Sequence, residues 1–337
     1  MYHFIYLTNI PSFYKLNLFN RIAEHKKILV IFTEQTSIER NSDFYTGERN
    51  FDYISIGNYV GIFKTIKLLF ILLINSYNKL ILAGFDSKEL WAAAFLNPKR
   101  KNCIVIESSI FESTTLGLKG YIKRIFLKRI TTAYVSGKAQ KDLALALGFK
   151  GIIKITKGVG IFNITDPPKF KEKNEIKNFI YVGRLSKEKN LKYLISTFNE
   201  LPYLQLNIIG FGPEEKELKS IAKRNIVFHG AIDNIKLPTF YRLNDVLILP
   251  SLSEPWGLVI EEAFNNGLPV IVSNMVGCSS EIIEINKNGL IFNLTETDSL
   301  KNAILMITDS SLYNNMCRNI CEMDFNEIAN LQVKCYL

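Results

Sequence analysis

Cysteine, histidine and tryptophan are scarce in this sequence of 337 residues, and its five cysteines form no regular framework. There is no C-x-x-C pair, and Cys317 and Cys321 lie four positions apart with no histidine beside them. A disulfide scaffold or a metal site would need paired or regularly spaced ligands. We therefore interpret the cysteines as reduced thiols of a cytoplasmic protein that needs no metal.

Long apolar runs are absent as well, since no stretch reaches the roughly 20 apolar residues that a membrane-spanning helix requires. The nearest approach is LLFILLI at 68–74, which follows Lys64 and Lys67. This run favours a helix buried against a sheet, and a shallow helix on a membrane surface is the alternative. The first ten residues, MYHFIYLTNI, lack the features of a signal peptide and predict a first strand.

Several cofactor and nucleic-acid motifs are missing. No G-x-G-x-x-G follows the first predicted strand, which argues against a dinucleotide oxidoreductase. No lysine motif for pyridoxal phosphate is evident, so a glycogen-type phosphorylase lacks support. No nucleic-acid-binding motif accompanies the basic residues, and we predict no nucleic-acid partner.

Positive charge is concentrated in the first half of the chain. Lys and Arg against Asp and Glu give 23 − 11 = +12 for residues 1–165 and 18 − 21 = −3 for residues 166–337, within a total of +9. The densest segment is KGYIKRIFLKR at 119–129, in which Ile122 and Phe126 lie on one helical stripe and the basic residues lie off it. A solvated helix face and an amphipathic helix on anionic lipid both fit this pattern, and we predict an anionic membrane surface as a partner.

Both halves alternate buried strands with helices. Apolar runs that predict strands in the first half lie at 2–7, 28–32, 79–83, 102–107 and 132–135, with helices at 13–23, 89–96 and 138–147. The second half predicts strands at 178–182, 205–209, 226–228, 245–249, 270–272 and 288–292, with helices at 189–199, 214–223, 237–243, 258–265 and 280–283. Continuous apolar strands separated by helices are typical of a parallel sheet covered on both faces.

A charged segment without apolar periodicity, DPPKFKEKNEIKN at 166–178, separates the two halves and is interpreted as a linker. The sequence therefore predicts an α/β protein with two doubly wound Rossmann-like domains facing across a cleft, at 1–165 and 166–318. In such domains ligands bind outside the carboxyl ends of the strands.

The most informative segment is PSLSEPWGLVIEEAFNNG at 250–267. It places Glu254 on a loop and Glu262 eight positions later, inside a predicted helix. Ionised carboxylates accept hydrogen bonds from hydroxyl groups, and the helix start at Trp256, Gly257 and Leu258 offers free N–H groups to a phosphate. Together these features predict a nucleotide-sugar site. We interpret Glu261 as solvent-facing and Glu262 as ligand-facing, although periodicity alone does not distinguish the two positions.

Two other strand ends carry suitable groups. Gly183 ends one strand and is followed by Arg184 and Lys189, which we expect to bind a diphosphate, the lysine from the start of its helix. Gly210, Phe211 and Gly212 end the next strand, where the phenyl ring would form a wall of the nucleotide pocket. Each loop alone is more typical of structure than of function, but together they would place two cations and two carboxylates at one edge of a sheet.

In order and spacing, the loops at 183–189 and 210–212, the segment 250–282 and NGLIF at 288–292 resemble the group 1 glycosyltransferases (glycosyltransferase family 4). The opening IPSFYKLNLFNRIAE and IESS at 106–109 are similar to the acceptor domain of bacterial surface-polysaccharide members. The resemblance implies the GT-B fold, a nucleotide-diphosphate-sugar donor and retention of anomeric configuration. It also implies a helical tail, residues 319–337, that crosses back onto the first domain.

The resemblance implies a role for each matched residue. Arg184 and Lys189 would bind the donor diphosphate, Glu254 the donor sugar, and Glu262 the ribose. The acceptor side would hold Ser12, with Glu107 or Ser108 at the place where many members carry a histidine. No D-x-D motif occurs, so the cations would replace a metal, and no cofactor is expected.

The acceptor that this reading implies is a glycan, in particular a lipid-diphosphate-linked glycan of bacterial surface polysaccharide synthesis. We expect the protein to lie in the cytoplasm, peripherally on the inner face of the membrane. A sugar-nucleotide epimerase or hydrolase, or a non-catalytic nucleotide-sugar-binding partner, would share the architecture. An acceptor-free product assay separates these alternatives.

Overall fold

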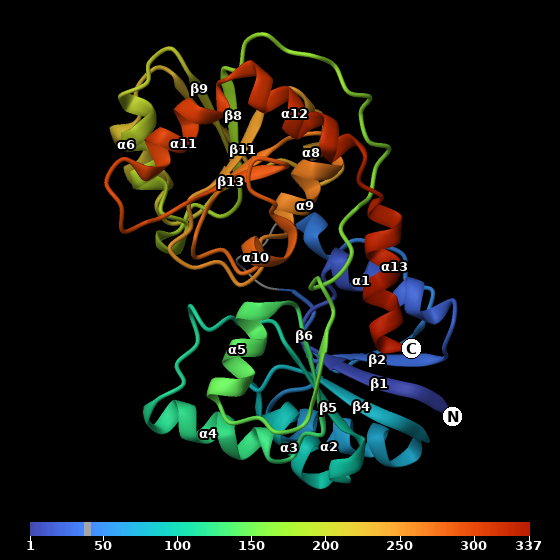
Figure 1. The fold of residues 1–337 in the computed structure, drawn as a ribbon. Helices are drawn as coiled ribbons and strands as arrows, with labels where there is room; N and C mark the ends of the chain where they lie inside the picture. The colour runs from blue at the N-terminus through green and yellow to red at the C-terminus, as the bar shows by residue number, and fades with distance from the viewer. Residues whose placement is uncertain (37–41) are drawn as a thin grey trace. The chain divides into compact units, whose positions relative to one another are not determined.

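A computed structural model describes residues 1–36 and 42–337, and it divides the chain into two units. Unit 1 contains residues 1–163 and 327–337, and unit 2 contains residues 164–326 (Figure 1). The first boundary lies two residues before the one expected at 165, and the chain returns to unit 1 at 327 rather than 319. The return is later because α12 (Ser310–Cys321) still packs on α9 (Leu258–Asn265) of unit 2.

Unit 1 is built on a parallel seven-stranded sheet with the order β3-β2-β1-β4-β5-β6-β7. The strands are β1 (Tyr2–Thr8), β2 (Ile28–Phe32), β3 (Asp52–Ser55), β4 (Tyr77–Ala83), β5 (Asn102–Ile106), β6 (Thr132–Val135) and β7 (Ile152–Ile155). The sequence did not indicate β3 and β7, which are the two edge strands and whose residues are all exposed or half-buried. The strands between them are mostly buried, and this burial produces the continuous apolar runs by which they were predicted.

Helices cover both faces of this sheet. They are α1 (Phe13–Ala23), α2 (Gly61–Ile74), α3 (Lys88–Leu96), α4 (Gly117–Leu127), α5 (Lys138–Ala146) and the C-terminal α13 (Phe325–Tyr336). Side chains from α2 to α5 share one core with alternate residues of β1, including Ile5 and Leu7. On the opposite face, Tyr6 packs against Phe19 of α1 at a ring distance of 4.7 Å.

The last helix belongs to this opposite face of unit 1. Tyr336 stacks on Tyr134 of β6 with ring centroids 4.7 Å apart and planes within 11°. Lys154 of β7 donates to the carbonyl oxygen of Cys335 at 3.0 Å. Two ring faces and a polar contact therefore hold the end of the chain on the first sheet.

Unit 2 contains a parallel six-stranded sheet with the order β10-β9-β8-β11-β12-β13. Its strands are β8 (Asn178–Val182), β9 (Gln205–Ile209), β10 (Ile226–Gly230), β11 (Val246–Leu249), β12 (Val270–Ser273) and β13 (Gly289–Phe292). Its further helices are α6 (Leu191–Asn199), α7 (Glu215–Ile221), α8 (Leu237–Arg242), α10 (Ser279–Ile282) and α11 (Ser299–Ile307). The strand order reverses between β8 and β11, and such a switch point is where doubly wound sheets bind ligands.

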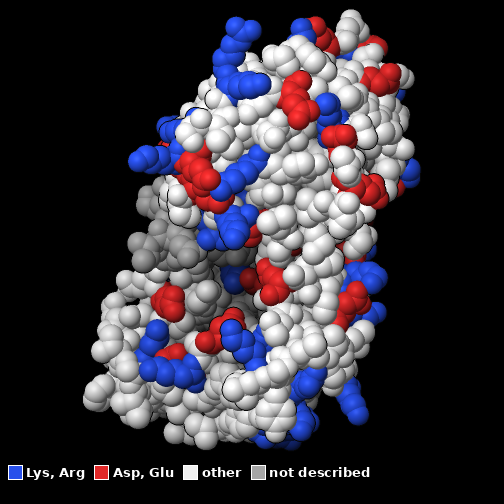
Figure 2. All heavy atoms as spheres, turned by 90° about the vertical axis from the view of Figure 1, so that its left-hand side faces the viewer, with Lys and Arg blue, Asp and Glu red and all other residues white. Residues whose placement is uncertain are grey.

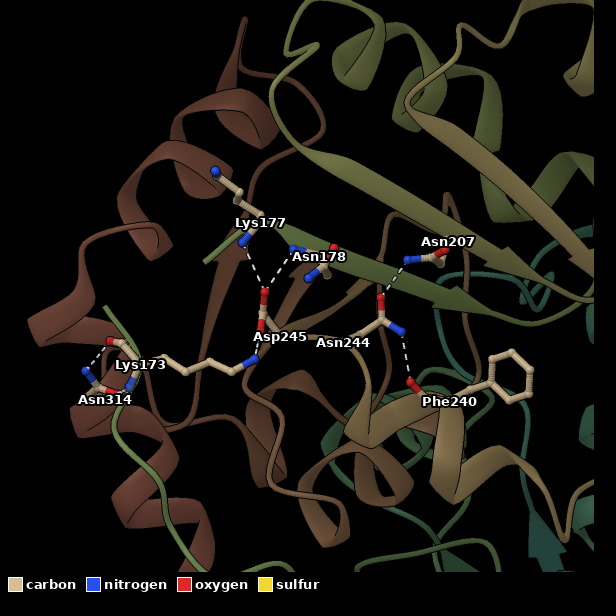
Figure 3. Close-up of polar contacts among 8 residues, drawn as sticks. All are labelled: Lys173, Lys177, Asn178, Asn207, Phe240, Asn244, Asp245 and Asn314. Atoms are coloured by element: carbon tan, nitrogen blue, oxygen red, sulfur yellow. Dashed lines mark hydrogen bonds and ion pairs between the residues drawn. The ribbon is translucent and has the colours of Figure 1, made fainter. Parts of the chain in front are cut away.

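The segment 166–178, interpreted as a linker, follows unit 1 in the chain and is fixed to unit 2 (Figure 3). The backbone of Lys173 exchanges two hydrogen bonds with the Asn314 side chain, at 2.9 and 2.8 Å, and its ammonium group pairs with buried Asp245. Asp245 also accepts from the backbone N–H groups of Lys177 and Asn178 at 3.0 and 2.8 Å. The segment joins the two units without helix or strand before β8, as a linker does, and polar contacts, which leave no apolar period in the sequence, anchor it to unit 2.

Candidate functional site

The loops that follow β8 and β11 meet at the switch point of unit 2. The backbone N–H of Leu252 donates to the carbonyl oxygen of Glu188 at 2.8 Å, and Asn190 Nδ2 donates to that of Pro250 at 3.2 Å. These contacts join residues that are 60 or more positions apart in the sequence. The predicted cationic and acidic segments are therefore adjacent in the structure.

Two glycines, Gly183 and Gly210, bring the loop after β9 close to the loop after β8. A Cβ atom on Gly210 would lie 1.8 Å from the carbonyl oxygen of Gly183, so only glycine fits there. Gly210 also has a φ of +134°, a conformation that other residues rarely adopt. Next to this contact, the N–H of Leu185 donates to the carbonyl oxygen of Phe211 at 2.9 Å, so the backbone of exposed Phe211 adjoins the loop that carries Arg184.

Lys189 and Glu254 form an ion pair across the joined loops. Each side chain is only 13% exposed, and Ser251 Oγ also donates to Glu254 at 3.3 Å. Lys189 does not lie at a helix start as predicted. It ends a 3-10 turn (Lys187–Lys189), and Asn190 in the left-handed conformation separates it from α6.

Arg184, the second predicted cation, pairs with Glu188 at 3.2 Å. Glu188 also accepts from Ser186 Oγ at 2.6 Å. Partial burial acts to raise the pKa of Glu188, but the Ser186 hydrogen bond and the Arg184 charge outweigh it and leave the pKa below its usual value. Both cations were identified from the sequence, and Glu188 was missed as a partner because a glutamate in a charged loop carries no distinctive pattern.

The backbone of Glu254 is fixed by the loop that follows β12. Its N–H donates to the carbonyl oxygen of Met275 at 3.1 Å, and its carbonyl oxygen accepts from Gly277 at 2.8 Å. A Cβ atom on Gly277 would lie 1.9 Å from the carbonyl oxygen of Pro255. This close approach of two backbones orients the carboxylate that Lys189 holds.

Trp256 and Glu261 lie inside unit 2. The indole is buried, and its Nε1 donates to Glu261 Oε2 at 2.8 Å. The prediction of a solvent-facing Glu261 is wrong, because its helix α9 is covered both by the sheet and by α12. The buried ring of Trp256 supports the shape of the loop, and the predicted contact of its backbone with the donor stays a prediction. Burial raises the pKa of Glu261 to about 8, against the effect of the indole hydrogen bond.

Glu262 is partly buried and accepts a hydrogen bond from the hydroxyl group of Tyr241, a residue of α8, at 2.9 Å. Burial raises the pKa of Glu262 to about 7, although the Tyr241 hydrogen bond acts in the opposite direction. Just before it, Gly257 begins α9 in a left-handed conformation with a φ of +104°, and Leu258 is the first helical residue. Tyr241 was not found from the sequence, since one tyrosine in a short helix carries no motif.

The residues predicted for the acceptor side lie in unit 1, at the carboxyl ends of its strands. Ser12 is buried at the N-cap of α1, and Ser108 is half-buried directly after β5. Glu107 pairs with Lys15 of α1 at 2.9 Å. Burial acts to lower the pKa of Lys15, but the Glu107 charge outweighs it and raises the pKa. Lys15 was not identified from the sequence, because its partner is more than 90 positions away.

Within the two described ranges, no group of three or more His, Cys, Asp or Glu residues is placed to hold a metal ion. The cations of unit 2 have their own carboxylate partners, and both pairs lie at the edge of the sheet where the strands end. In such an arrangement the phosphate oxygens of a ligand can replace a protein carboxylate as the partner of each cation. The absence of a metal requirement stays a prediction.

Comparison with known proteins gives a family match in the second unit and relatives over more of the chain. The sequence model of the family described as "Glycosyl transferases group 1" matches residues 163–322. An uncharacterized 41.2 kDa protein in the cps region of Klebsiella pneumoniae is 30% identical over 246 residues, which are 68% of this chain and 66% of that protein. The Escherichia coli UDP-Gal:alpha-D-GlcNAc-diphosphoundecaprenol alpha-1,3-galactosyltransferase is 33% identical over 170 residues, or 45% and 43% of the two chains. The chain thus spans about two thirds of the first relative and under half of the second.

Solved structures match nearly the whole chain. Anabaena Alr3699/HepE in complex with UDP and glucose has a TM-score of 0.72, with 97% of both chains covered and 15% sequence identity. At this identity the likeness shows the fold alone. The predicted fold class, α/β of the GT-B type with two Rossmann-like domains, is confirmed.

Proposed function

This chain belongs to the group 1 glycosyltransferases, and we propose that it transfers a sugar from a nucleotide-diphosphate donor to a glycan acceptor with retention of configuration. The family match, the relative in a cps region and the galactosyltransferase relative support this reaction class. The nucleoside diphosphate in the Anabaena structure supports the class of donor. The polysaccharide pathway of the relatives makes a lipid-diphosphate-linked acceptor our choice, with the protein peripheral on the cytoplasmic face of the membrane.

The single observation that carries the proposal is the Lys189–Glu254 pair at the switch point, with Arg184 in the adjoining loop. When the sugar–phosphate bond breaks, negative charge builds up on the leaving diphosphate. Two preorganised cations stabilise that charge more than they stabilise the bound donor, which lowers the barrier. Glu254, released from Lys189 by the diphosphate, would accept hydrogen bonds from hydroxyl groups of the donor sugar.

Glu262 is assigned to the ribose of the donor. A carboxylate accepts two hydroxyl hydrogen bonds only when it is ionised, and Tyr241 already donates to one of its oxygen atoms. Because the pKa of Glu262 is raised to about 7, donor binding would have to draw a proton from this group near neutral pH. Phe211, Gly210 and the first turn of α9 would complete the nucleotide pocket in unit 2.

For the chemistry itself, the acceptor hydroxyl would attack from the face that the diphosphate leaves, and a phosphate oxygen would take its proton. No side-chain base is then required, and the product keeps the anomeric configuration of the donor. Nuclear magnetic resonance of the product tests the stereochemistry directly. Inversion at the reacting carbon would contradict this mechanism.

Donor turnover by Arg184→Ala and Lys189→Ala variants tests the assignment of the cations. We expect each change to lower kcat by about 10²-fold or more with UDP- or GDP-sugars, as removal of one charge-stabilising donor does elsewhere. Lys192→Ala is the matched control, since Lys192 lies on α6 of the same unit in an exposed pair with Glu217. Full activity in either loop variant, or activity lost to chelator and restored by manganese, would overturn the proposed role of the cations.

The assay also separates the alternative functions. An epimerase or hydrolase would convert the donor without an acceptor, and a non-catalytic partner would bind the donor without converting it. Transfer that requires the acceptor is the result we expect.

A further inference from the structure

Helix α2 carries an apolar face that the fold of unit 1 leaves uncovered. Leu68, Ile71 and Leu72 are buried in the core below the sheet, as the sequence analysis favoured. The opposite stripe is exposed and recurs at helical spacing, at Tyr59, Val60, Ile62, Phe63, Ile66, Phe70, Leu73 and Ile74. An exposed stripe of this length on one helix is more than the scattered apolar residues of an ordinary surface.

The uncovered apolar surface extends over the neighbouring helices. α3, which packs against α2, ends in exposed Phe95 and Leu96. Arg129, just after α4, donates to the carbonyl oxygens of Phe95 and Asn97 at 3.1 and 3.0 Å, which ties the end of α4 to the end of α3. At and before the start of α4, further exposed side chains are Leu116, Leu118, Tyr121 and Ile122.

The charge along α2 and α4 is of one sign. No Asp or Glu occurs from 53 to 85 or from 113 to 141, while Lys64, Lys67, Lys119 and Lys128 fall within these ranges. Lys67 Nζ lies 5.9 Å from the ring centres of both Tyr59 and Phe70, so its aliphatic stem follows the apolar stripe. Figure 2 shows Lys and Arg side chains toward the lower edge of unit 1, the level at which Figure 1 places α2, α3 and α4.

We infer that α2 lies flat in the headgroup layer of an anionic bilayer, with the stripe from Tyr59 to Ile74 as its inserted face. Lipid offers what this surface lacks, because acyl chains cover apolar side chains while phosphates face the lysines at the rim. α2 has 14 residues, and no helix in the described part of the chain has both the length and the apolar content to cross a bilayer. A second copy of the chain fits less well, since a symmetric contact would bring the same basic surface against itself.

The position of this surface in unit 1 bears on the acceptor. α2 follows β3, and α4 follows β5, so both helices begin near the carboxyl edge of the sheet. Glu107, predicted for the acceptor side, leaves β5 at the same edge. Membrane binding by α2 thus deepens the proposal of a lipid-linked acceptor. It rests on that proposal only for the identity of the acceptor held in the bilayer.

Vesicle flotation of the full chain tests the inference. Wild-type protein should float with vesicles of phosphatidylcholine and phosphatidylglycerol and much less with phosphatidylcholine alone, and salt should weaken the binding. Phe63→Ser together with Phe70→Ser should lower the partition coefficient at least about tenfold, because two large apolar side chains leave the bilayer. The matched control is Ile235→Ser with Leu243→Ser in unit 2, where the exposed fractions of 86% and 68% are as large as the 69% and 52% of Phe63 and Phe70.

Lys64→Gln with Lys67→Gln should remove part of the preference for anionic vesicles while leaving the residual binding to neutral ones. Equal flotation of the Phe63/Phe70 variant and wild type, or no flotation of wild type, would overturn the inference. Light scattering that shows a wild-type dimer and a monomeric Phe63/Phe70 variant would assign the surface to a second copy instead.

The same variants separate this inference from the proposed function. Flotation requires no sugar transfer, so an inactive wild type that still floats would refute the proposed reaction alone. The Phe63/Phe70 variant should retain transfer to an acceptor dissolved in detergent and lose it with an acceptor in vesicles.

Discussion

Replacing Glu261 by Gln is expected to remove a pH-dependent loss of stability from unit 2. Burial holds the pKa of Glu261 at about 8 in the folded protein, against a usual value of 4.5. The folded state therefore keeps a proton that the unfolded state releases. The stability that this proton provides is fully present below pH 4.5 and is lost as the pH rises through about 8. Linkage gives a decrease in the free energy of unfolding of about 2 kcal/mol between pH 6 and pH 8.

Glutamine preserves the geometry while removing the titration. Its amide oxygen can still accept from the Trp256 indole, which the glutamate does at 2.8 Å. The variant should therefore equal the parent near pH 5 and exceed it by about 2 kcal/mol or more at pH 8. Glu172→Gln, at an exposed carboxylate of the same unit, serves as the control and should change little.

The assay uses one tryptophan as a local probe. The chain has only two tryptophans, and Trp91 lies in unit 1, so a Trp91→Phe background leaves Trp256 beside the altered residue as the sole indole. Urea unfolding followed by its fluorescence at several pH values reports on unit 2 alone. The same pH slope in Glu261→Gln and its parent would refute the assignment of a protonated carboxyl at this position.

Two further changes test the geometry of the site. Gly210→Ala should destabilise unit 2 by several kcal/mol and lower its melting temperature, because the new Cβ would lie 1.8 Å from the Gly183 carbonyl oxygen; Gly230→Ala, at a positive φ but with open space, should cost only about 1 kcal/mol. Tyr241→Phe should raise the pKa of Glu262 further by removing its hydrogen bond. As the pH is lowered, the affinity for UDP or the preferred nucleotide, measured by calorimetric titration, should therefore fall at a higher pH than in wild type. An unchanged pH midpoint would contradict the assignment of Glu262 to the ribose.

The buried part of the fold was predictable because burial on both faces leaves continuous apolar runs. The strands β2, β6 and β9 and the helices α1 and α9 have the bounds that the sequence indicated. The edge strands β3 and β7 were missed for the converse reason, since their exposed side chains leave a mixed pattern. Lys189 was assigned to a helix because periodicity cannot detect the left-handed residue, Asn190, that interrupts it.

The site was predictable where its residues share a loop motif, and it was not where two segments meet in space. Glycines and cations at 183–189 and 210–212 indicated strand-end loops, and the loops are adjacent in the structure. The partners Tyr241 and Lys15 have no local signature, because each acts through a residue far along the chain. The burial of Glu261 was missed because helix periodicity shows an exposed face only when one side of the helix is uncovered.

The position of the cations follows from the topology once these contacts are known. Strand order reverses between β8 and β11, and the loops that follow these two strands meet at this switch point. Asn190, in the left-handed conformation, follows Lys189, which pairs with Glu254, and its side-chain amide donates to the carbonyl oxygen of Pro250. An ion pair that is only 13% exposed on each side gains little stability by itself, because desolvation offsets the attraction. The cost of burying this pair is explained if Glu254 holds Lys189 in place for a diphosphate. A bound diphosphate would then replace the carboxylate and form charge-assisted hydrogen bonds with the lysine.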